Sequence, residues 1–374
     1  MPALIDRQQG SKRFPWIAGQ IQPVVRKFHS SIVFWSNPMN IYCVVLNWND
    51  WASTTLCVKS LFDNGVAPEH VLIVDNASTD GSADCLRREL PEVPLVVSPR
   101  NLGFAAGMNF GAKQILEKCA DDDAIIFVNN DALIVGGMAA LKAALARKDV
   151  GLVSPVILNR EHPEQVHFQG SDYDWSRAEI VFYDKEMAAR RESDGLIDSP
   201  RVVGAAVAVS LDFIRKVGLF DESLFMYYED DDLSARSLRA GYRNVVASGF
   251  RIAHTGKSSQ DAPPHYYFYM KRNEFYFWGR YMTPGRWRWC RLKILSEGCM
   301  NAYQWRADPE RGKAVREGVL SALAHKTGFR EEIRPGLLGA VLFLNPRMTA
   351  WCVRTLGKIV KKLTPSTSGV GGMQ

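Results

Sequence analysis

The sequence predicts an α/β fold in which helices cover a mostly parallel sheet. Two observations predict it: short apolar runs alternate with helical stretches after residue 38, and polar clusters follow several of the apolar runs directly. Ligands bind at the carboxyl ends of the strands in such sheets, which is where these polar clusters would lie. The fold class therefore already indicates a binding cleft.

The elements follow in order from the hydrophobic periodicity. Strands are expected at four apolar runs, residues 41–46, 71–74, 95–97 and 124–128. Helices are expected between them, at 51–62, 82–90 and 103–118. Beyond residue 150 the pattern is mixed, with strands expected at 202–211 and 245–252 and a helix at 230–240 that stops at Gly241. Residues from 266 onward are aromatic and helical in pattern.

The chain divides into three predicted regions. Residues 1–38 show no regular pattern and no signal-peptide layout, so we expect a disordered extension, or a segment that precedes the natural start at Met39. Residues 39–284 contain the fold signal, and residues 285–374 form a basic helical C-terminal region. A chain of 374 residues is long enough for one large domain or two ordinary ones.

The charge is unevenly distributed. Residues 285–374 contain 16 Lys and Arg against 6 Asp and Glu, interleaved with tryptophan and leucine. This composition suits an anionic membrane surface better than nucleic acid, and the apolar run at 337–344 is too short to span a bilayer. The alternative, a basic solvated face on a helical subdomain, is about equally compatible with this composition.

The seven cysteines indicate a compartment. They are scattered and odd in number, without a Cys-x-x-Cys pair, which argues against disulfides and against a zinc site. We expect a cytoplasmic protein at the inner face of the cytoplasmic membrane.

Four consecutive acids at 229–232 are the most informative feature of the chain. One or two carboxylates suffice to stabilise a helix start, whereas four repel one another, so their presence favours a catalytic site. Asp230 lies at the expected strand-to-helix junction. The alternative is that all four acids only complement the helix dipole.

A second polar cluster, Asn129, Asn130 and Asp131, ends the apolar run at 124–128. One carboxylate with amide neighbours suits Mg²⁺ or Mn²⁺ shared with substrate phosphates, because these ions keep waters and need few protein ligands. His254 follows the strand expected at 245–252 and is a candidate further ligand.

Two further motifs follow expected strands. Asp75 and Asn76 end the second strand, where a carboxylate can accept the N3–H of a pyrimidine, although an ordinary turn is equally compatible. Arg100 and Gly103 follow the third strand, where arginine could meet phosphate and glycine would allow close backbone approach. A tight helix entry is the structural alternative.

Six motifs occur in order and together resemble one family. They are Asp-Asn-Ala-Ser-Thr-Asp-Gly-Ser at 75–82, Asn-Leu-Gly-Phe-Ala-Ala-Gly-Met-Asn at 101–109, Asn-Asn-Asp at 129–131, Gly-Leu-Phe-Asp-Glu at 218–222, Glu-Asp-Asp-Asp-Leu at 229–233 and Arg-Ala-Gly-Tyr at 239–242. Over residues 41–281 the chain resembles the inverting family 2 glycosyltransferases, particularly the rhamnosyltransferase-like branch. The chain departs from the commoner Asp-x-Asp metal motif at Asn129, and Asp231 fills a position that is often apolar in the family.

The resemblance implies a GT-A fold and the transfer of a sugar, possibly rhamnose or another deoxyhexose, from a nucleoside-diphosphate donor to a glycan or lipid-linked glycan in cell-surface polysaccharide synthesis. It implies that Asp75 reads the base, that Asp131 holds the metal with His254, and that Asp230 is the base, with Glu229 beside it in the catalytic site. We place in the nucleotide-sugar site Asn47, Asp75, Asn76, Arg100, Asn101, Gly103, Asn109 and Asn130. Near the sugar or acceptor we place Gly204, Asp232 and Arg272.

Two other functions remain open from the sequence. A sugar-phosphate nucleotidyltransferase should have a Gly-rich basic loop after its first strand, where this chain has Asn-Trp-Asn-Asp-Trp at 47–51. A non-catalytic glycan-assembly subunit would need neither a metal carboxylate nor a base.

Overall fold

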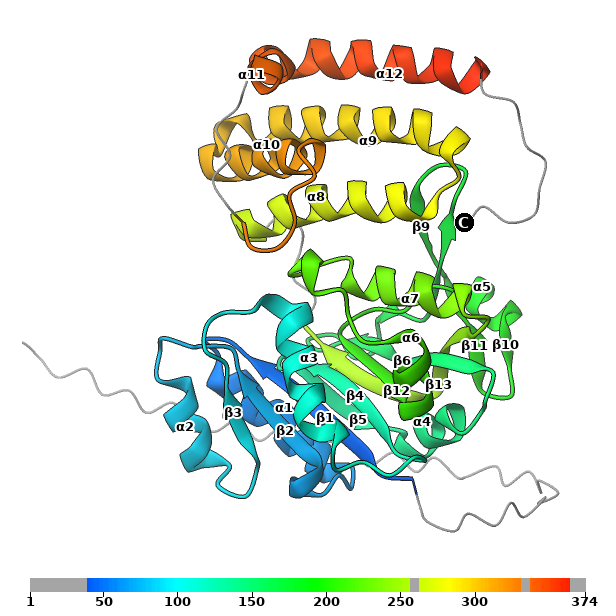
Figure 1. Ribbon diagram of the computed structural model, residues 1–374. Helices are drawn as coiled ribbons and strands as arrows, with labels where there is room; N and C mark the ends of the chain where they lie inside the picture. Colours follow the sequence, from blue (N-terminus) through cyan, green and yellow to red (C-terminus); the bar gives the residue numbers. More distant parts are fainter. Residues whose placement is uncertain (1–38, 256–261, 331–336, 364–374) are drawn as a thin grey trace, which may run out of the picture. The chain divides into compact units, whose positions relative to one another are not determined.

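The computed structural model describes residues 39–255, 262–330 and 337–363 (Figure 1). The predicted N-terminal extension, residues 1–38, lies outside the described residues. The residues from Met39 onward form one compact unit.

The first half of the sheet is parallel, as predicted. Its strands are β1 (Ile41–Asn47), β2 (Val71–Asp75), β3 (Leu95–Val97) and β4 (Ala124–Asn129), in the spatial order β4-β1-β2-β3. The helices between them are α1 (Trp51–Asp63), α2 (Ser82–Glu89) and α3 (Gly103–Leu116). Alternate residues of β1 enter two separate cores, Cys43 and Val45 that of α1 and Val44 that of α3, so the strand is buried on both faces.

The second half of the sheet is mixed, which corrects the expectation of a mostly parallel sheet. Its strands are β5 (Ala132–Gly136), β6 (Val150–Asn159), β7 (Val166–Phe168), β10 (Glu192–Ser193), β11 (Leu196–Asp198), β12 (Ala206–Ser210) and β13 (Arg243–His254). Across the described residues the sheet has eleven strands, and β12 lies antiparallel between β4 and β6. A separate hairpin consists of β8 (Ser171–Asp174) and β9 (Glu179–Phe182). The helices of this half are α4 (Met138–Leu145), α5 (Lys185–Arg190), α6 (Leu211–Val217) and α7 (Glu229–Arg239).

The strand expected at 202–211 is shorter than predicted because its first residues bond to α7 instead of to a strand. The N–H of Val202 donates to Ser234 Oγ at 3.2 Å, and the N–H of Gly204 donates to Asp230 Oδ2 at 2.8 Å. The apolar run therefore supplies both strand β12 and a loop that contacts the acidic helix.

Five helices complete the described chain, α8 (Pro264–Tyr281), α9 (Pro284–Gln304), α10 (Pro309–Leu323), α11 (Leu337–Leu344) and α12 (Pro346–Leu363) (Figure 1). The boundary predicted after residue 284 falls at the first residue of α9, whose Trp287 ring packs edge to face with Phe275 of α8. The α10 helix approaches α8 closely, because Gly318 leaves no room for a methyl group beside the backbone of Phe268. No helix among the described residues is both long and apolar enough to cross a bilayer.

The start of α3 depends on a glycine. Gly103 has φ of +81°, and the next two N–H groups, of Phe104 and Ala105, both donate to the carbonyl oxygen of Phe225. That oxygen satisfies donors that a helix start otherwise leaves unpaired. A Cβ at position 103 would lie 2.5 Å from the same oxygen. The close approach predicted here is thus made by the chain's own Phe225.

We predict that Gly103→Ala destabilises the protein more than Gly81→Ala. Both glycines have nearly the same positive φ, +81° and +82°, so both substitutions incur about 1–2 kcal/mol of left-handed strain. A methyl group at Gly81 meets no described atom within 4 Å, whereas at Gly103 it clashes with Phe225, which adds about 1–3 kcal/mol. Urea unfolding of the two variants measures the difference. Equal losses would show that the Phe225 contact is not a tight constraint.

Candidate active site

Asp75 and Asn47 meet at the carboxyl ends of adjacent strands, where β1 pairs in register with β2. Asn47 Nδ2 donates to Asp75 Oδ1 at 2.7 Å and to Ser78 Oγ at 3.1 Å, while the N–H of Ser78 donates to Asp75 Oδ2 at 3.0 Å. Both side chains are buried. Asn47 therefore orients the carboxylate of Asp75, and Asp75 remains the predicted contact to the nucleotide base.

The side chain of Asn76 makes hydrogen bonds to the loop after β3, and Asn101 belongs to that loop. Asn76 Nδ2 donates to Asn101 Oδ1 and to the carbonyl of Gly103, and its Oδ1 accepts from Leu102 N–H and from Ser98 Oγ. These contacts fix the loop that leads into α3. They assign Asn76 a structural role beside its predicted one.

Asn109 and Arg100 lie in different surroundings. Asn109 is buried and joins α3 to the backbone of Phe220, through Nδ2 to the carbonyl at 2.9 Å and through Oδ1 to the N–H at 3.1 Å. The side chain of Arg100 is exposed after β3 and stays a predicted phosphate contact. Asn109 thus contacts the protein itself, at the segment that precedes the acidic helix.

Asp131 and His254 meet although 123 residues separate them. Strand β5 begins directly after Asp131, β13 ends at His254, and the two strands pair antiparallel with His254 opposite Ala132. His254 Nε2 lies 3.1 Å from Asp131 Oδ1, and both side chains are partly exposed. The register shifts between Arg251 and Ile252, which lie opposite Gly136 and Ile134, so Val135 of β5 is the extra residue in this pairing. Asn130, next to Asp131, donates from Nδ2 to Thr54 Oγ1 at 3.2 Å.

A cavity of about 390 Å³ lies between these strand ends and helix α7. Its aromatic walls include Phe104, Tyr227 and Tyr228. Its polar lining consists of Asn129, Arg201, Glu229, Asp230, Asp231 and His254, together with the backbone at Gly204. The Oδ1 atom of Asn129 is buried and accepts no hydrogen bond from a described group, so it can accept one from a ligand in the cavity.

The four acids of α7 have four different environments. Glu229 is buried, and its Oε2 has no hydrogen-bond partner among the described residues. Burial, together with the charge of Asp230, raises the pKa of Glu229 well above its ordinary value. Burial thus favours the protonated form of Glu229 relative to an exposed glutamate.

Asp230 lies at the cavity with its carboxylate held by backbone groups. Its Oδ2 accepts the N–H of Gly204 at 2.8 Å, and its Oδ1 accepts the N–H of Asp231 at 2.9 Å. Each oxygen has a further lone pair, and the side chain is 12% exposed. Asp230 is thus oriented by the backbone, with capacity left to accept a proton.

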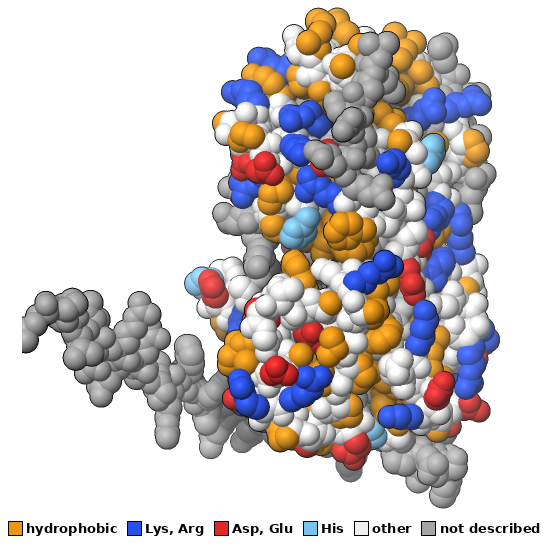
Figure 2. All heavy atoms as spheres, turned by 60° about the vertical axis from the view of Figure 1, so that its left-hand side comes forward, with side chains coloured by type: hydrophobic (Ala, Val, Ile, Leu, Met, Phe, Trp, Pro, Cys, Tyr) orange, Lys and Arg blue, Asp and Glu red, His pale blue; other side chains and the backbone are white. Residues whose placement is uncertain are grey.

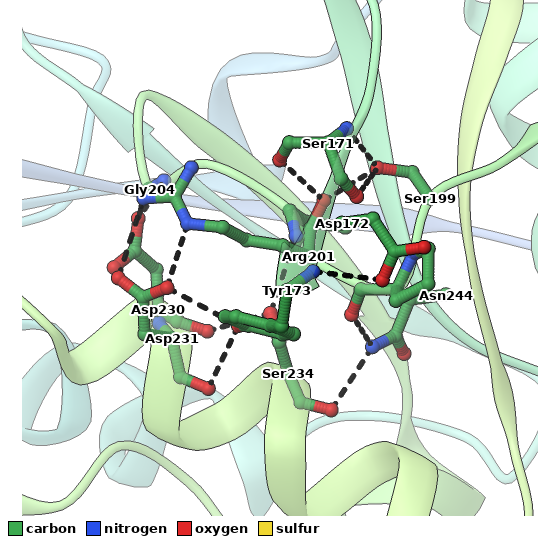
Figure 3. Close-up of polar contacts among 12 residues, drawn as sticks. Ser171, Asp172, Tyr173, Ser199, Arg201, Gly204, Asp230, Asp231, Ser234 and Asn244 are labelled. Carbon is green, nitrogen blue, oxygen red and sulfur yellow. Dashed lines mark hydrogen bonds and ion pairs between the residues drawn. The ribbon is translucent and has the colours of Figure 1, made fainter. Parts of the chain in front are cut away.

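Asp231 belongs to a buried ion pair (Figure 3). Arg201 donates from Nε to Asp231 Oδ1 at 2.6 Å and from Nη2 to Oδ2 at 3.2 Å, and Tyr173 OH donates to Oδ1 at 3.1 Å. Burial raises the pKa of Asp231 to about 6, although Arg201 acts in the opposite direction. Arg201 also lies 4.0 Å from Asp230 Oδ2 and faces the cavity, so its charge serves both carboxylates.

Asp232 and Arg272 do not line the cavity as it is described. Asp232 is buried and accepts from Arg236, Arg280 and Tyr281, which corrects its expected place near the sugar. Arg272 is buried as well, and it donates to the carbonyls of Gly328 and Leu224. Both residues stabilise elements that surround the cavity, and neither contributes to the cavity lining.

The segment between Leu224 and Glu229 is strained. Phe225, Tyr227 and Tyr228 all have positive φ, between 64° and 70°, which bulky residues rarely adopt. Asn273 of α8 stabilises it, because its Nδ2 lies 2.8–2.9 Å from the carbonyl oxygens of Leu224, Met226 and Tyr227. These hydrogen bonds position the start of α7 and the residues Tyr227 and Tyr228, which line the cavity.

Sequence reasoning missed three residues of this site: Arg201, Tyr173 and Asn273. The sequence contains a weak indication of Arg201. Four acids need a compensating cation if they are buried, and this arginine directly precedes an apolar run. Tyr173 and Asn273 reach the site from β8 and α8, and no local pattern marks them.

A family model matches part of the chain. Residues 42–192, less than half of the chain, match the family model described as Glycosyl transferase family 2. This segment is similar to the family 2 glycosyltransferases. The matched segment contains Asp75 and Asp131 and ends before the acids of α7, so the structure, not this match, joins the two parts of the site.

Two curated relatives are named as rhamnosyltransferases. The chain is 28% identical over 240 residues to "N-acetylglucosaminyl-diphospho-decaprenol L-rhamnosyltransferase" of Mycobacterium tuberculosis, covering 59% of this chain and 78% of the relative. It is 24% identical over 217 residues to "dTDP-rhamnosyl transferase RfbF" of Shigella flexneri, covering 58% of this chain and 69% of the relative. The glycosyltransferase function is thus favoured over a nucleotidyltransferase or a non-catalytic subunit.

A solved structure shares the fold. The structure of GalNAc-T7 with UDP, GalNAc and Mn²⁺ superposes with a TM-score of 0.55 at 15% identity, over 77% of this chain. The chain spans 58% of the length of that protein. The GT-A fold expected from the sequence is confirmed.

We predict that Arg201→Met destabilises the protein by about 3–5 kcal/mol at pH 8 and by less at pH 5. Removing one partner of a buried ion pair leaves the other charge uncompensated. Asp231 already has a pKa raised from 3.8 to about 6, and losing Arg201 raises it further. A carboxyl whose folded pKa exceeds its unfolded value loses stability as the pH rises between them, so the loss grows from pH 5 to pH 8.

Urea unfolding at both pH values measures the effect. The control is Arg87→Met, which removes an exposed partner of Asp84 and should change little at either pH. Equal losses at pH 5 and pH 8 would mean that Asp231 is not the charge that Arg201 compensates.

Proposed function

We propose that this glycosyltransferase transfers its sugar with inversion, from a nucleoside-diphosphate donor to a hydroxyl of a glycan or lipid-linked glycan. The single observation that carries the proposal is the position of Asp230 at the cavity. Of the four acids of α7, Glu229 is buried with no hydrogen-bond partner on Oε2 among the described residues, and two are paired with arginines. Asp230 faces the cavity with a backbone N–H group on each oxygen and Arg201 4.0 Å away. The sugar is proposed to be rhamnose or another deoxyhexose, on the names of the two relatives.

The chemistry follows from this position. The acceptor hydroxyl binds beside Asp230 and transfers its proton to the carboxylate as its oxygen attacks C1 of the sugar. The C1–oxygen bond to the diphosphate breaks on the opposite side, so one displacement inverts the anomeric centre. The Gly204 N–H holds the carboxylate in place.

Asp75 is proposed to read the base of the donor. Asn47 and the N–H of Ser78 occupy one lone pair on each carboxylate oxygen, so a second lone pair remains to accept the N3–H of a pyrimidine. The relative named as a dTDP-rhamnosyl transferase supports a pyrimidine donor.

The residues at the strand ends fit a divalent cation. No group of three or more His, Cys, Asp or Glu that could hold a metal occurs among the described residues, but Asp131 and His254 offer an oxygen and a nitrogen 3.1 Å apart. Mg²⁺ and Mn²⁺ use few protein ligands where substrate phosphates and waters complete the shell. Asp131 and His254 would hold the ion, and it would neutralise the diphosphate leaving group.

We propose that the protein works at the inner face of the cytoplasmic membrane. The relative that acts on a diphospho-decaprenol acceptor supports this placement, as does the basic C-terminal region. A lipid-linked acceptor keeps its polar end at the membrane surface, where a peripheral enzyme can reach it.

A donor screen tests the proposal. The protein is incubated with Mn²⁺ and a panel of nucleotide sugars, and slow release of nucleoside diphosphate is followed. Release from one or a few donors is expected. Formation of pyrophosphate from a sugar phosphate and a nucleoside triphosphate would instead support a nucleotidyltransferase, and no turnover or donor binding would support a non-catalytic subunit.

We predict that Asp230→Asn keeps donor binding and loses turnover by about 10²–10⁴, since an amide preserves shape but cannot take the proton. Calorimetric binding and kcat give the two readouts. Asp232→Asn is the matched comparison, because that carboxylate contacts three side chains outside the cavity lining; it should lower the melting temperature and leave the kcat of the folded enzyme within severalfold. The reverse pattern would move the base to Asp232.

We predict that Asp131→Ala and His254→Ala each weaken Mn²⁺-dependent nucleoside-diphosphate binding by at least about tenfold, because each removes one of two protein ligands. Titration calorimetry with and without Mn²⁺ measures it. His162→Ala is the control, since this histidine is exposed and paired with Glu164. Unchanged metal dependence in both variants would place the ion elsewhere.

A further inference from the structure

Helix α12 packs on α9 through a face of small residues. Gly357 lies against the Leu292 side chain, and the carbonyl of Ala350 accepts from Ser296 Oγ at 3.0 Å. At its two ends, Arg347 and Lys361 lie over the rings of Tyr303 and Trp289. These contacts run along the helix and identify the face of α12 that packs on α9. The opposite face is the outer face.

The outer face of α12 exposes large apolar side chains. Of the fifteen large hydrophobic residues that are exposed in the described part of the chain, six fall between residues 341 and 359. They are Val341 and Leu344 of α11 and Met348, Trp351, Leu356 and Ile359 of α12, each 50% exposed or more. At 100° per residue, Met348, Leu356 and Ile359 share one stripe along α12, opposite Ala350 and Gly357. We call these six residues the apolar strip.

Basic side chains flank the strip. Arg347, Arg354, Lys358 and Lys361 are exposed and project from one side of α12, next to Trp351. The sequence from 337 to 363 contains no Asp or Glu. Figure 2 shows hydrophobic and basic side chains together at the top of the molecule, where Figure 1 places α12.

We propose that the outer face of α11 and α12 docks on an anionic lipid membrane, with α12 lying in the plane of the interface. An exposed apolar stripe beside a row of cations is what an interfacial helix presents to lipid. At 1.5 Å per residue the 18-residue helix covers about 27 Å of surface. A second copy of the chain fits worse, because pairing two such faces brings cations against cations.

This inference rests on the proposed function in one respect, the lipid-linked acceptor near which docking would hold the enzyme. It narrows the membrane contact from the whole basic C-terminal region to one helix face. The test therefore uses neither sugar nor acceptor.

Flotation with vesicles tests the docking surface. The full chain is mixed with vesicles of phosphatidylcholine alone or with phosphatidylglycerol added, at low and high salt. It should float with the anionic vesicles at low salt and less at high salt. Arg354→Gln and Lys358→Gln should each lower partitioning roughly fivefold, the equivalent of about 1 kcal/mol for a charge near the surface. The pair Trp351→Ser with Ile359→Ser should lower it at least about tenfold.

Matched controls come from α1, which exposes both kinds of side chain. Leu56 is 48% exposed and Ile359 is 50% exposed, so Leu56→Ser is the control for the apolar change, and Lys59→Gln is the control for the charge. All variants should keep the melting temperature of the unmodified chain, because the altered side chains are exposed. Substitution is preferable to truncation, since α9 and α10 pack against α8.

Three outcomes would overturn the proposal. Strip variants that float like the unmodified chain would show that the lipid contact lies elsewhere, and an unmodified chain that never floats would show that there is none. A concentration-dependent dimer that Trp351→Ser dissolves, measured by sedimentation equilibrium, would make the strip an interface between copies. Nucleoside-diphosphate binding in solution is measured on the same variants, so a failure of the proposed function would be seen separately.

Discussion

The buried ion pair between Arg201 and Asp231 is the interaction on which the site depends. Helix α7 begins with four carboxylates in or beside a core, and such a start is stable only if the charges are compensated. Arg201 compensates Asp231 and lies near Asp230, Arg236 and Arg280 compensate Asp232, and burial raises the pKa of Glu229. Asp230 faces the cavity and is held by backbone N–H groups, so the compensation of its neighbours gives it a distinct role.

The same constraint explains the strained segment before α7. The segment that leads to the four acids first passes the start of α3. There the N–H groups of Phe104 and Ala105 donate to the carbonyl oxygen of Phe225. This path forces three aromatic residues into positive φ, and Asn273 holds their carbonyls. Gly103 and Asn109 then have related roles, since both connect α3 to the segment that precedes α7.

The sequence predicts the first half of this fold well because there each element has a local cause. The strands β1, β2 and β4 are apolar runs that are buried on both faces, β3 is a short apolar strand at the sheet edge, and each helix between them begins at a turn signal. The second half is harder because its pairing is non-local: β12 lies antiparallel between β4 and β6, and the start of its apolar run bonds to α7 instead. Asp131 and His254 could be named as a pair from their positions at strand ends. Arg272 and Asp232 could not be placed, since only tertiary contacts show that their polar atoms are already satisfied.

The irregular pairing of β5 and β13 has a consequence for how such a site can change over time. Side chains alternate between the two faces of a strand, so the number of residues between an irregularity and a strand end decides which face the last side chain occupies. The consecutive residues Arg251 and Ile252 lie opposite Gly136 and Ile134, so Val135 is an extra residue of β5, the strand that begins directly after Asp131. Loss of Val135, or gain of a residue beside it, would change the face on which the start of β5 lies relative to its end, without substituting Asp131 or His254. A lineage could therefore lose or regain the contact between these two side chains through a single codon insertion or deletion.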